Sequence, residues 1–228
     1  MRLAREKPQQ GLDTAHAWEQ AGGGPPARHC AAVATLALGH DREAAAMLES
    51  VAEEELKAGS KTLASQLLGQ AGQAWQLAGD MDRAYAAQTR GLELNPDDTE
   101  LRIDRALTLA DEKKYWEALD DFNLVQAEQP DRPDVLMWMA AAYRRLGVYD
   151  LARDLIDRSL SIEPDNPDAL LERGILRHLA QDEAGARADW ERVVKLAHGT
   201  PAGSAAQANL KLIAGGGAHA PGKAPSSP

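Results

Sequence analysis

Residues 130–164 read PDRPDVLMWMAAAYRRLGVYDLARDLIDRSLSIEP, and this stretch begins and ends on a proline. The two prolines are 34 residues apart, and Pro96 stands another 34 residues before Pro130. Each proline follows a stretch in which apolar residues recur at helical spacing, and a proline there ends the helix. A period of 34 residues therefore organises this part of the chain, and such periods are typical of repeat architectures.

The same period aligns residues of similar size in columns. Two columns hold only small residues: Gly72, Ala106, Ala140 and Gly174 in one, and Ala84, Ala118, Ala152 and Ala186 in the other. Two more columns hold mostly large apolar residues: Trp75, Leu109 and Tyr143 in one, and Phe122, Ile156 and Trp190 in the other. Because a small residue lets two helix backbones approach closely, we predict that the small columns mark the crossing points of packed helix pairs.

These columns resemble the tetratricopeptide repeat (TPR) over residues 65–198. The third unit matches best, through Ala140, Tyr143, Gly147, Tyr149, Ala152, Ile156, Leu160 and Pro164. The pattern is broken at five positions: Arg105, Arg173 and Arg177 replace apolar residues, Gln88 replaces an aromatic residue, and His198 replaces the fourth proline. The resemblance implies an all-α, right-handed solenoid of antiparallel helix pairs.

The predicted organisation is five helix pairs followed by a capping helix. We expect an N-terminal arm over residues 1–24 with one short helix, Leu12–Ala21, which the Gly22–Pro26 stretch ends. Residues 25–64 are predicted to hold a degenerate helix pair. Ala44 and Ala84 are 40 residues apart instead of 34, so we infer an insertion of six residues, which the loop Lys57–Ser60 would absorb. Four TPR-like repeats occupy residues 65–200, and a capping helix follows at 201–214. The Gly-, Pro- and Ser-rich residues 215–228 are predicted to be a disordered tail.

The composition favours a soluble helical protein and disfavours nucleic-acid binding. Only 4% of residues are aromatic, so the interior must consist mainly of Ala and Leu, which favour helix. The net charge of −10 opposes general phosphate binding. The sequence shows neither an apolar stretch long enough to cross a bilayer nor an apolar leader after Met1. The compartment stays open: cytoplasmic by default, and periplasmic or secreted if a signal segment has been removed.

We find no pattern that predicts catalysis, a metal or a cofactor. The six histidines show none of the paired helical spacings that place two ligands on one face. His29 and Cys30 are adjacent on a predicted helix, so their side chains diverge and cannot form a nucleophile and its base. The run Glu53-Glu54-Glu55 is interpreted as a solvated helix face. The chain is therefore not expected to be an enzyme.

The resemblance implies a binding groove formed by the first helix of each pair. Mapped onto this sequence, it assigns partner binding to Ile103, Asp104, Leu107, Met137, Trp138, Ala141, Arg144, Leu171, Glu172 and Ile175. Gln66, Gln70, Gln73 and Gln76 would line the groove in the first regular unit. An acidic margin would consist of Glu100, Asp104, Asp134, Asp168 and Glu172. Family members that bind chaperone tails use Lys, Arg and Asn here, and these residues are nearly absent, so such a tail is disfavoured.

The predicted function is a scaffold or adaptor that binds a segment of another protein, apolar with basic flanks. Trp138 would be its anchor, because no packing column needs this aromatic residue. Two alternatives stay open: a structural homo-oligomer, and a non-catalytic subunit of an enzyme complex. The apolar groove residues could also be covered by neighbouring helices, which is the usual fate of apolar residues at helical spacing.

Overall fold

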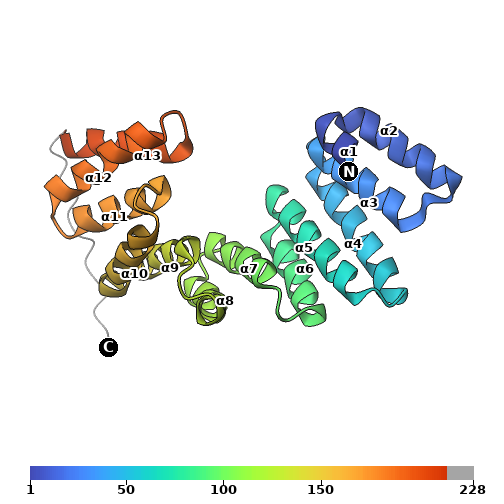
Figure 1. Ribbon diagram of the computed structural model, residues 1–228, viewed down its shortest axis with the longest axis horizontal. Coiled ribbons are helices and arrows are strands. Elements are labelled where there is room, and N and C mark those ends of the chain that lie inside the picture. The colour runs from blue at the N-terminus through green and yellow to red at the C-terminus, as the bar shows by residue number, and fades with distance from the viewer. Residues whose placement is uncertain (215–228) are drawn as a thin grey trace. The chain divides into compact units, whose positions relative to one another are not determined.

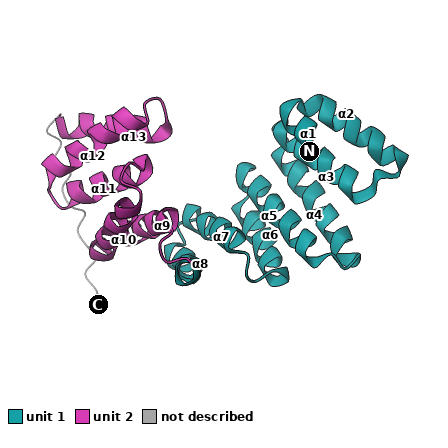
Figure 2. Ribbon diagram, in the orientation of Figure 1, with its two compact units in different colours: residues 1–128 teal, residues 129–228 magenta. Residues whose placement is uncertain are grey.

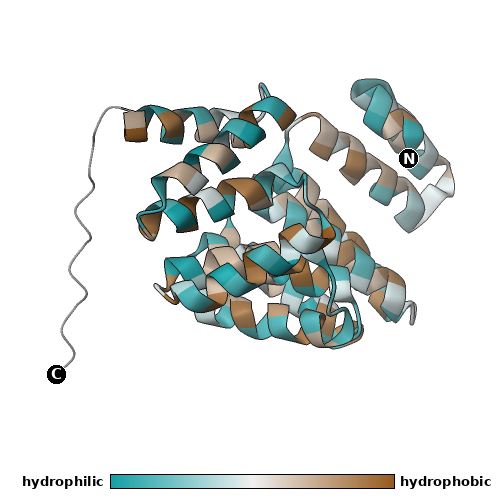
Figure 3. Ribbon diagram, turned by 60° about the vertical axis from the view of Figure 1, so that its left-hand side comes forward, coloured by the Kyte–Doolittle hydropathy of each residue, from teal (hydrophilic) through white to brown (hydrophobic). Residues whose placement is uncertain are grey.

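The computed structural model describes residues 1–214 and is helical throughout this range, with no β-strand in it. The chain divides into two compact units, residues 1–128 and 129–228 (Figure 2), which are described separately below. Each helix carries both hydrophobic and hydrophilic residues (Figure 3), as expected of helices that bury one face and expose the other.

The first unit contains eight α-helices, which Figure 1 labels along the chain. Their bounds are α1 Arg2–Glu6, α2 Pro8–Trp18, α3 Gly24–Ala37, α4 Asp41–Lys57, α5 Lys61–Leu77, α6 Met81–Leu94, α7 Thr99–Asp111 and α8 Tyr115–Glu128. From α3 onward, consecutive helices pack as pairs: α3 with α4, α5 with α6, and α7 with α8.

The second unit contains two more pairs and a final helix. Its helices are α9 Pro133–Arg145, α10 Tyr149–Ile162, α11 Pro167–Leu179, α12 Glu183–Leu196 and α13 Pro201–Ala214. The pairs are α9 with α10 and α11 with α12, and α13 packs against α12 and α11. The prediction of five pairs and a terminal helix at 201–214 is confirmed, whereas the tail predicted at 215–228 lies outside the described residues.

Side chains at the turns explain where the helices begin. Asp98 accepts a hydrogen bond from the backbone N–H of Leu101 at 3.0 Å, and Asn166 accepts from Asp168 and Ala169 at 3.1 Å. These acceptors satisfy N–H groups that have no partner within the first helical turn. Between the helices of a pair, Gly147 adopts a positive φ of 78°, which a glycine accommodates without strain. The predicted helix stops and starts therefore have a direct hydrogen-bonding cause.

The two helices of a pair fit together through residues 16 positions apart. At Gly174, an added Cβ would lie 2.6 Å from Cδ1 of the buried Trp190, and at Gly72 it would lie 2.6 Å from Cγ of Gln88. Where the column holds alanine, the residue 16 positions later has a different shape from Trp190 and Gln88: it is Phe122 after Ala106, and Ile156 after Ala140. Glycine thus makes room where the alanine methyl group would overlap the opposing side chain.

The N-terminal arm differs from the prediction. It forms two α-helices, α1 and α2, and the second begins at Pro8 and ends at Trp18 instead of spanning 12–21. Pro8 is tolerated in the first turn because its missing N–H would have had no helical partner. Residues 19–23 form a wider π-type turn that contains Gly22 at φ 89°. Moreover, α2 packs along α3, so the segment is part of the first unit's packed structure.

The predicted six-residue insertion is helical instead of forming a loop. Helices α4 and α5 have 17 residues each, against 14 in α6 and 13 in α7. The connection between α4 and α5, residues 58–60, is one residue shorter than the connection 95–98 between α6 and α7. The insertion therefore adds about one turn to each of two neighbouring helices, because their Ala- and Leu-rich sequences continue the helix without a stop.

The arginines that depart from the TPR pattern are paired with buried carboxylates. Arg105 donates two hydrogen bonds to Asp121, at 2.8 and 2.7 Å, and the Asp121 side chain is almost fully buried. Arg173 and Asp189 stand 68 residues after Arg105 and Asp121, and Arg173 donates two hydrogen bonds to Asp189, at 2.9 and 2.7 Å. Arg177 donates a further hydrogen bond to Asp189, at 2.8 Å. The hydrogen bonds to Asp121 raise the pKa of Arg105 above its ordinary value. In the intervening repeat, the same two positions hold Met139 and Leu155.

This pairing predicts that Arg105 and Asp121 can be replaced together but not separately. Arg105→Met should lower the free energy of unfolding by about 3 kcal/mol, because it leaves the buried Asp121 carboxylate without its main partner. The double variant Arg105→Met/Asp121→Leu, which copies Met139 and Leu155, should recover most of that loss. Chemical denaturation measures both variants. If the free energy of unfolding of the double variant falls by the sum of the losses in the two single variants, residues 105 and 121 do not act as a pair.

Candidate functional site

The predicted partner-binding residues occupy equivalent positions on three first helices. We call these positions on the first helices of the pairs the A-face, and we describe the A-face of each unit separately. Its members on α7 are Ile103, Asp104 and Leu107; on α9 they are Met137, Trp138, Ala141 and Arg144; on α11 they are Leu171, Glu172 and Ile175. The α7 residues belong to the first unit, and the others belong to the second. The structure therefore brings the α9 and α11 residues together as one surface and shows the α7 residues separately.

In the second unit the A-face is an apolar strip. Met137 on α9 and Leu171 and Ile175 on α11 are half-buried and pack against a core that includes Ala140, Leu170 and Trp190. Trp138 and Ala141 are also half-buried. Each of these side chains therefore packs partly into the unit and keeps part of its surface accessible. The alternative that neighbouring helices cover these residues completely does not hold for them.

One charged pair lies within this strip. Arg144 on α9 binds the carboxylate of Glu172 on α11 through two hydrogen bonds, of which Nη2 to Oε2 measures 3.1 Å and Nε to Oε1 is very short. The Glu172 side chain is buried and Arg144 is largely shielded from solvent. A carboxylate with two guanidinium hydrogen bonds is satisfied, and the pair ties α9 to α11.

In the first unit the A-face is more polar. Ile103 is only 3% exposed, so it contributes to the core and not to an accessible surface. Asp104 and Leu107 are half-buried. Burial raises the pKa of Asp104 above its ordinary value of 3.8, and the nearby Glu100 and Asp98 raise it further, although a hydrogen bond from Gln73 lowers it. Gln73 donates that bond from Nε2 to Oδ2 at 2.7 Å.

The glutamines predicted to line the groove instead connect neighbouring helices. Gln70 Oε1 lies 2.9 Å from His29 Nε2 on α3, and Gln73 binds Asp104 on α7. Gln76 donates to Thr108 on α7 at 2.6 Å, and Thr108 donates in turn to the buried Gln88 at 2.9 Å. These contacts form a polar ladder that joins α3, α5 and α7. Sequence reasoning missed this ladder, although the three-residue spacing of the glutamines was its signal.

The predicted acidic margin is partly neutralised. Asp134 accepts hydrogen bonds from Arg132, with Nε to Oδ1 at 3.0 Å and Nη2 to Oδ2 at 2.9 Å. Glu172 is paired with Arg144, as described above. These two carboxylates therefore present little net charge to a partner, and the expectation of a continuous acidic margin is wrong at both. The negative charge that stays accessible includes the exposed carboxylates of Glu100 and Asp168.

His29 and Cys30 are the adjacent residues considered above as a nucleophile and its base. His29 contacts Gln70, whereas the Cys30 sulfur lies 3.7 Å from the sulfur of Met1, so the two adjacent residues have different partners. Within residues 1–214, no three His, Cys, Asp or Glu side chains are grouped so that they could hold a metal ion. In the same range, no helix is both long enough and apolar enough to cross a membrane.

Comparison with known proteins identifies the repeat. A family model described as tetratricopeptide repeat matches residues 133–176, which contain α9, α10 and most of α11. This is the region in which the sequence pattern is strongest. The Protein CTR9 homolog of Arabidopsis thaliana is 28% identical over 123 residues, which is 54% of this chain. The matched region spans only 11% of that much longer relative.

Solved structures extend the likeness to more of the chain. YrrB, described as a TPR protein with an unusual peptide-binding site, matches with a TM-score of 0.61 at 14% identity, over 86% of this chain and 97% of its own. MamA from Desulfovibrio magneticus RS-1 matches with a TM-score of 0.55 at 19% identity, over 69% of this chain and 97% of its own. The Thermus thermophilus protein TTC0263 matches with a TM-score of 0.60 at 23% identity, over 66% of this chain and 83% of its own. At these identities the likeness concerns the fold, which consists of consecutive helix pairs of the tetratricopeptide type.

Proposed function

We propose that this chain is a non-catalytic scaffold that binds a segment of another protein against the A-face. The observation that carries the proposal is the half-buried apolar strip of the second unit, formed by Met137, Trp138, Leu171 and Ile175 around the Arg144–Glu172 pair. Half-buried apolar side chains on a rigid helical frame are suited to binding, because they lose little conformational freedom when a partner covers them.

The arrangement of the strip favours an extended or helical segment as the partner. Its residues recur on two first helices at equivalent positions, Met137 with Leu171 and Ala141 with Ile175, so the surface repeats along the direction in which the pairs stack. A linear segment with apolar residues at regular intervals matches such a repeated surface. The peptide-binding site described for YrrB, which shares the fold, supports a peptide as the type of ligand.

Basic residues next to the apolar ones would suit the charge of this chain. The net charge is −10, and the A-face positions and their neighbours include Asp104, Glu100 and Asp168. A negative potential raises the rate at which a basic segment associates and disfavours acidic competitors. Because Asp134 and Glu172 are already paired with arginines, we assign this effect to the overall charge of the chain and to the exposed Asp168.

Trp138 provides the direct test of the A-face. Partners are first captured with the intact chain, and the affinity of each purified partner is then measured by calorimetry. Trp138→Ala should weaken binding by about 2 kcal/mol or more, because a central aromatic anchor carries much of the binding energy. Its effect on the free energy of unfolding should stay within about 1 kcal/mol.

The matched control is Leu212→Ala on α13, where a 66% exposed leucine lies outside the A-face. This variant should bind like the parent chain. Equal losses of affinity in the two variants would remove the A-face from the mechanism. An unfolding cost of about 3 to 5 kcal/mol for Trp138→Ala would assign this residue to the core. Self-association through the A-face would instead appear as a dimer that Trp138→Ala dissociates in sedimentation, and that result would favour the homo-oligomer.

A second test concerns the charge on Asp104. Because its pKa is raised in the folded chain, the folded state holds this proton more tightly than the unfolded state does. The contribution of Asp104 to stability should therefore fall as the pH rises from its ordinary pKa through the raised one. Asp104→Asn should remove this fall and be more stable than the parent chain at neutral pH. Chemical denaturation between about pH 4 and pH 8 tests this, with Asp168→Asn as the exposed control. An Asn variant that is less stable at neutral pH would contradict it.

A further inference from the structure

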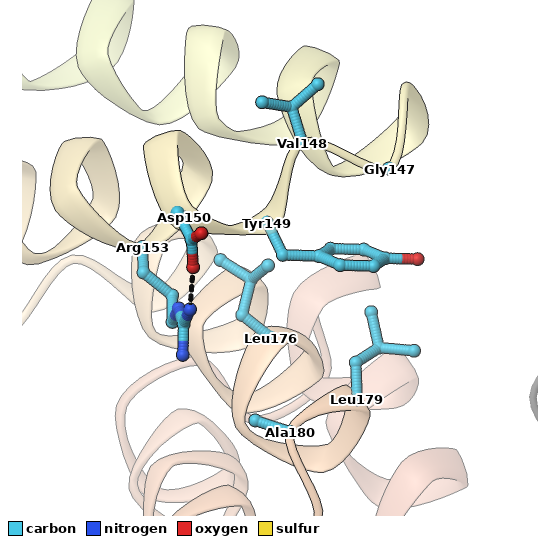
Figure 4. Close-up of a pocket in the computed structure, with 8 residues that line it drawn as sticks. All are labelled: Gly147, Val148, Tyr149, Asp150, Arg153, Leu176, Leu179 and Ala180. Carbon is cyan, nitrogen blue, oxygen red and sulfur yellow. Dashed lines mark hydrogen bonds and ion pairs between the residues drawn. The ribbon is translucent and has the colours of Figure 1, made fainter.

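A pocket away from the A-face lies at the turns of the second unit (Figure 4). It is open, has a volume of about 520 Å³, and is formed where the turn between α9 and α10 meets the end of α11. Its lining residues are Gly147, Val148, Tyr149, Asp150, Arg153, Leu176, Leu179 and Ala180. We call it the turn pocket. Pockets of this size are typical of ligand sites, and this one is large enough for one large side chain with its flanking backbone.

One side of the turn pocket is apolar. Tyr149 is 45% exposed and Leu179 is 50% exposed, although both are large and apolar in their main part. Leu176, which also lines the pocket, is buried. Figure 4 shows the Tyr149 ring and Leu179 on one side of Leu176, and the Asp150–Arg153 pair on the other. Two large apolar side chains are thus left in solvent at the edges of the same pocket, which is the arrangement that a buried partner side chain would complete.

The other side of the turn pocket is charged, with its negative member the more accessible. The Asp150 side chain is 89% exposed and makes an ion pair with Arg153 three residues later. Such a surface pair contributes little to stability, so Asp150 can bind another cation at small cost. The turn after Ala180 adds two further carboxylates, Asp182 and Glu183, whose side chains are about half exposed.

The leucine edge of the turn pocket distinguishes this repeat from the others, because the preceding repeats hold Asp111 and Arg145 at the position of Leu179. The residues 68 positions before Tyr149 and Leu179 are Met81 and Asp111. A turn of the same type in the first unit therefore carries an acidic residue where this one carries an exposed leucine. Tyr149 belongs to the TPR pattern, whereas Leu179 does not, so the exposure of Leu179 beside the Tyr149 ring needs a separate explanation.

We propose that the turn pocket is a second protein-binding site, which takes a large apolar side chain flanked by lysine or arginine. The apolar side chain would lie between Tyr149 and Leu179, and the basic neighbour would bind Asp150. The basic character of the ligand follows from the exposed Asp150 carboxylate and from the net charge of −10, which repels acidic segments. This site is independent of the A-face, so either one can fail without the other.

The test uses the ¹⁵N-labelled full chain and three short Gly/Ser-based peptides, whose centres read Lys-Phe-Lys, Glu-Phe-Glu and Lys-Ala-Lys. The Lys-Phe-Lys peptide should shift the backbone amide resonances of Gly147, Tyr149, Leu179 and Ala180 in a saturable way. The Glu-Phe-Glu peptide should bind at least about tenfold more weakly, and the Lys-Ala-Lys peptide should give no saturable shift. Tighter binding of the Glu peptide, or shifts only at other residues, would overturn the proposal.

Three variants separate the parts of the site. Tyr149→Ala and Leu179→Ser should each weaken the Lys-Phe-Lys peptide by about tenfold, and Asp150→Asn should reduce the preference for Lys over Glu flanks. Leu212→Ser, which changes another exposed leucine (66% exposed, against 50% for Leu179) on α13, should leave the affinity unchanged. Circular dichroism checks that each variant is folded. If Leu179→Ser binds like the parent chain, or if it dissociates a dimer of this chain that excludes the peptide, the proposed occupant is wrong.

Discussion

The contact between residues 16 positions apart, one on each helix of a pair, determines how closely the two helices approach. In each regular repeat a small residue of the first helix faces the side chain of the second, as Gly174 faces Trp190 and Gly72 faces Gln88. Dense packing allows no overlap there, so the sizes of the two residues must be matched. When the crossing is set, the orientation of each first helix is set as well, and with it the positions of the A-face residues.

Polar residues then connect the pairs and select which parts of the surface stay free. In the first unit, Gln73 and Gln76 are used to hold α5 against α7, so their amides are not available to a partner. In the second unit, the corresponding connection is the single pair of Arg144 and Glu172. The apolar residues around that pair are left half-buried. The difference leaves more apolar side-chain surface accessible in the second unit, and this is the surface that we propose for partner binding.

The period of the sequence predicted the fold well because it reflects a local and repeated constraint. Pro96, Pro130 and Pro164 mark helix ends whose cause is the missing N–H group, and this cause does not depend on distant residues. The extra turn of α4 and α5 was missed because the period says nothing about whether an insertion coils or loops. The Arg105–Asp121 pair was missed because each residue alone departs from the TPR pattern. Only a comparison of both columns, against Met139 and Leu155, shows that they change together.

The candidate surface was harder to predict because exposure depends on all neighbours at once. Ile103 and Met137 occupy the same column, yet one is buried and the other is half-buried. Asp134 and Glu172 looked like free acids, and their partners Arg132 and Arg144 could not be assigned from spacing alone. The turn pocket had no sequence signal, since Tyr149 fits the TPR pattern and Leu179 is only the last residue of a helix.

The most direct test of matched sizes is the effect of Gly174→Ala on stability in two backgrounds, the parent chain and Trp190→Phe. In the parent chain the new methyl group would overlap the indole of Trp190, so the free energy of unfolding should fall by about 1 to 3 kcal/mol. In the Trp190→Phe background the pair copies Ala106 and Phe122, and the same change should raise the free energy of unfolding by about 0.5 to 1 kcal/mol, because alanine favours helix over glycine. A change of the same sign in both backgrounds would contradict the account.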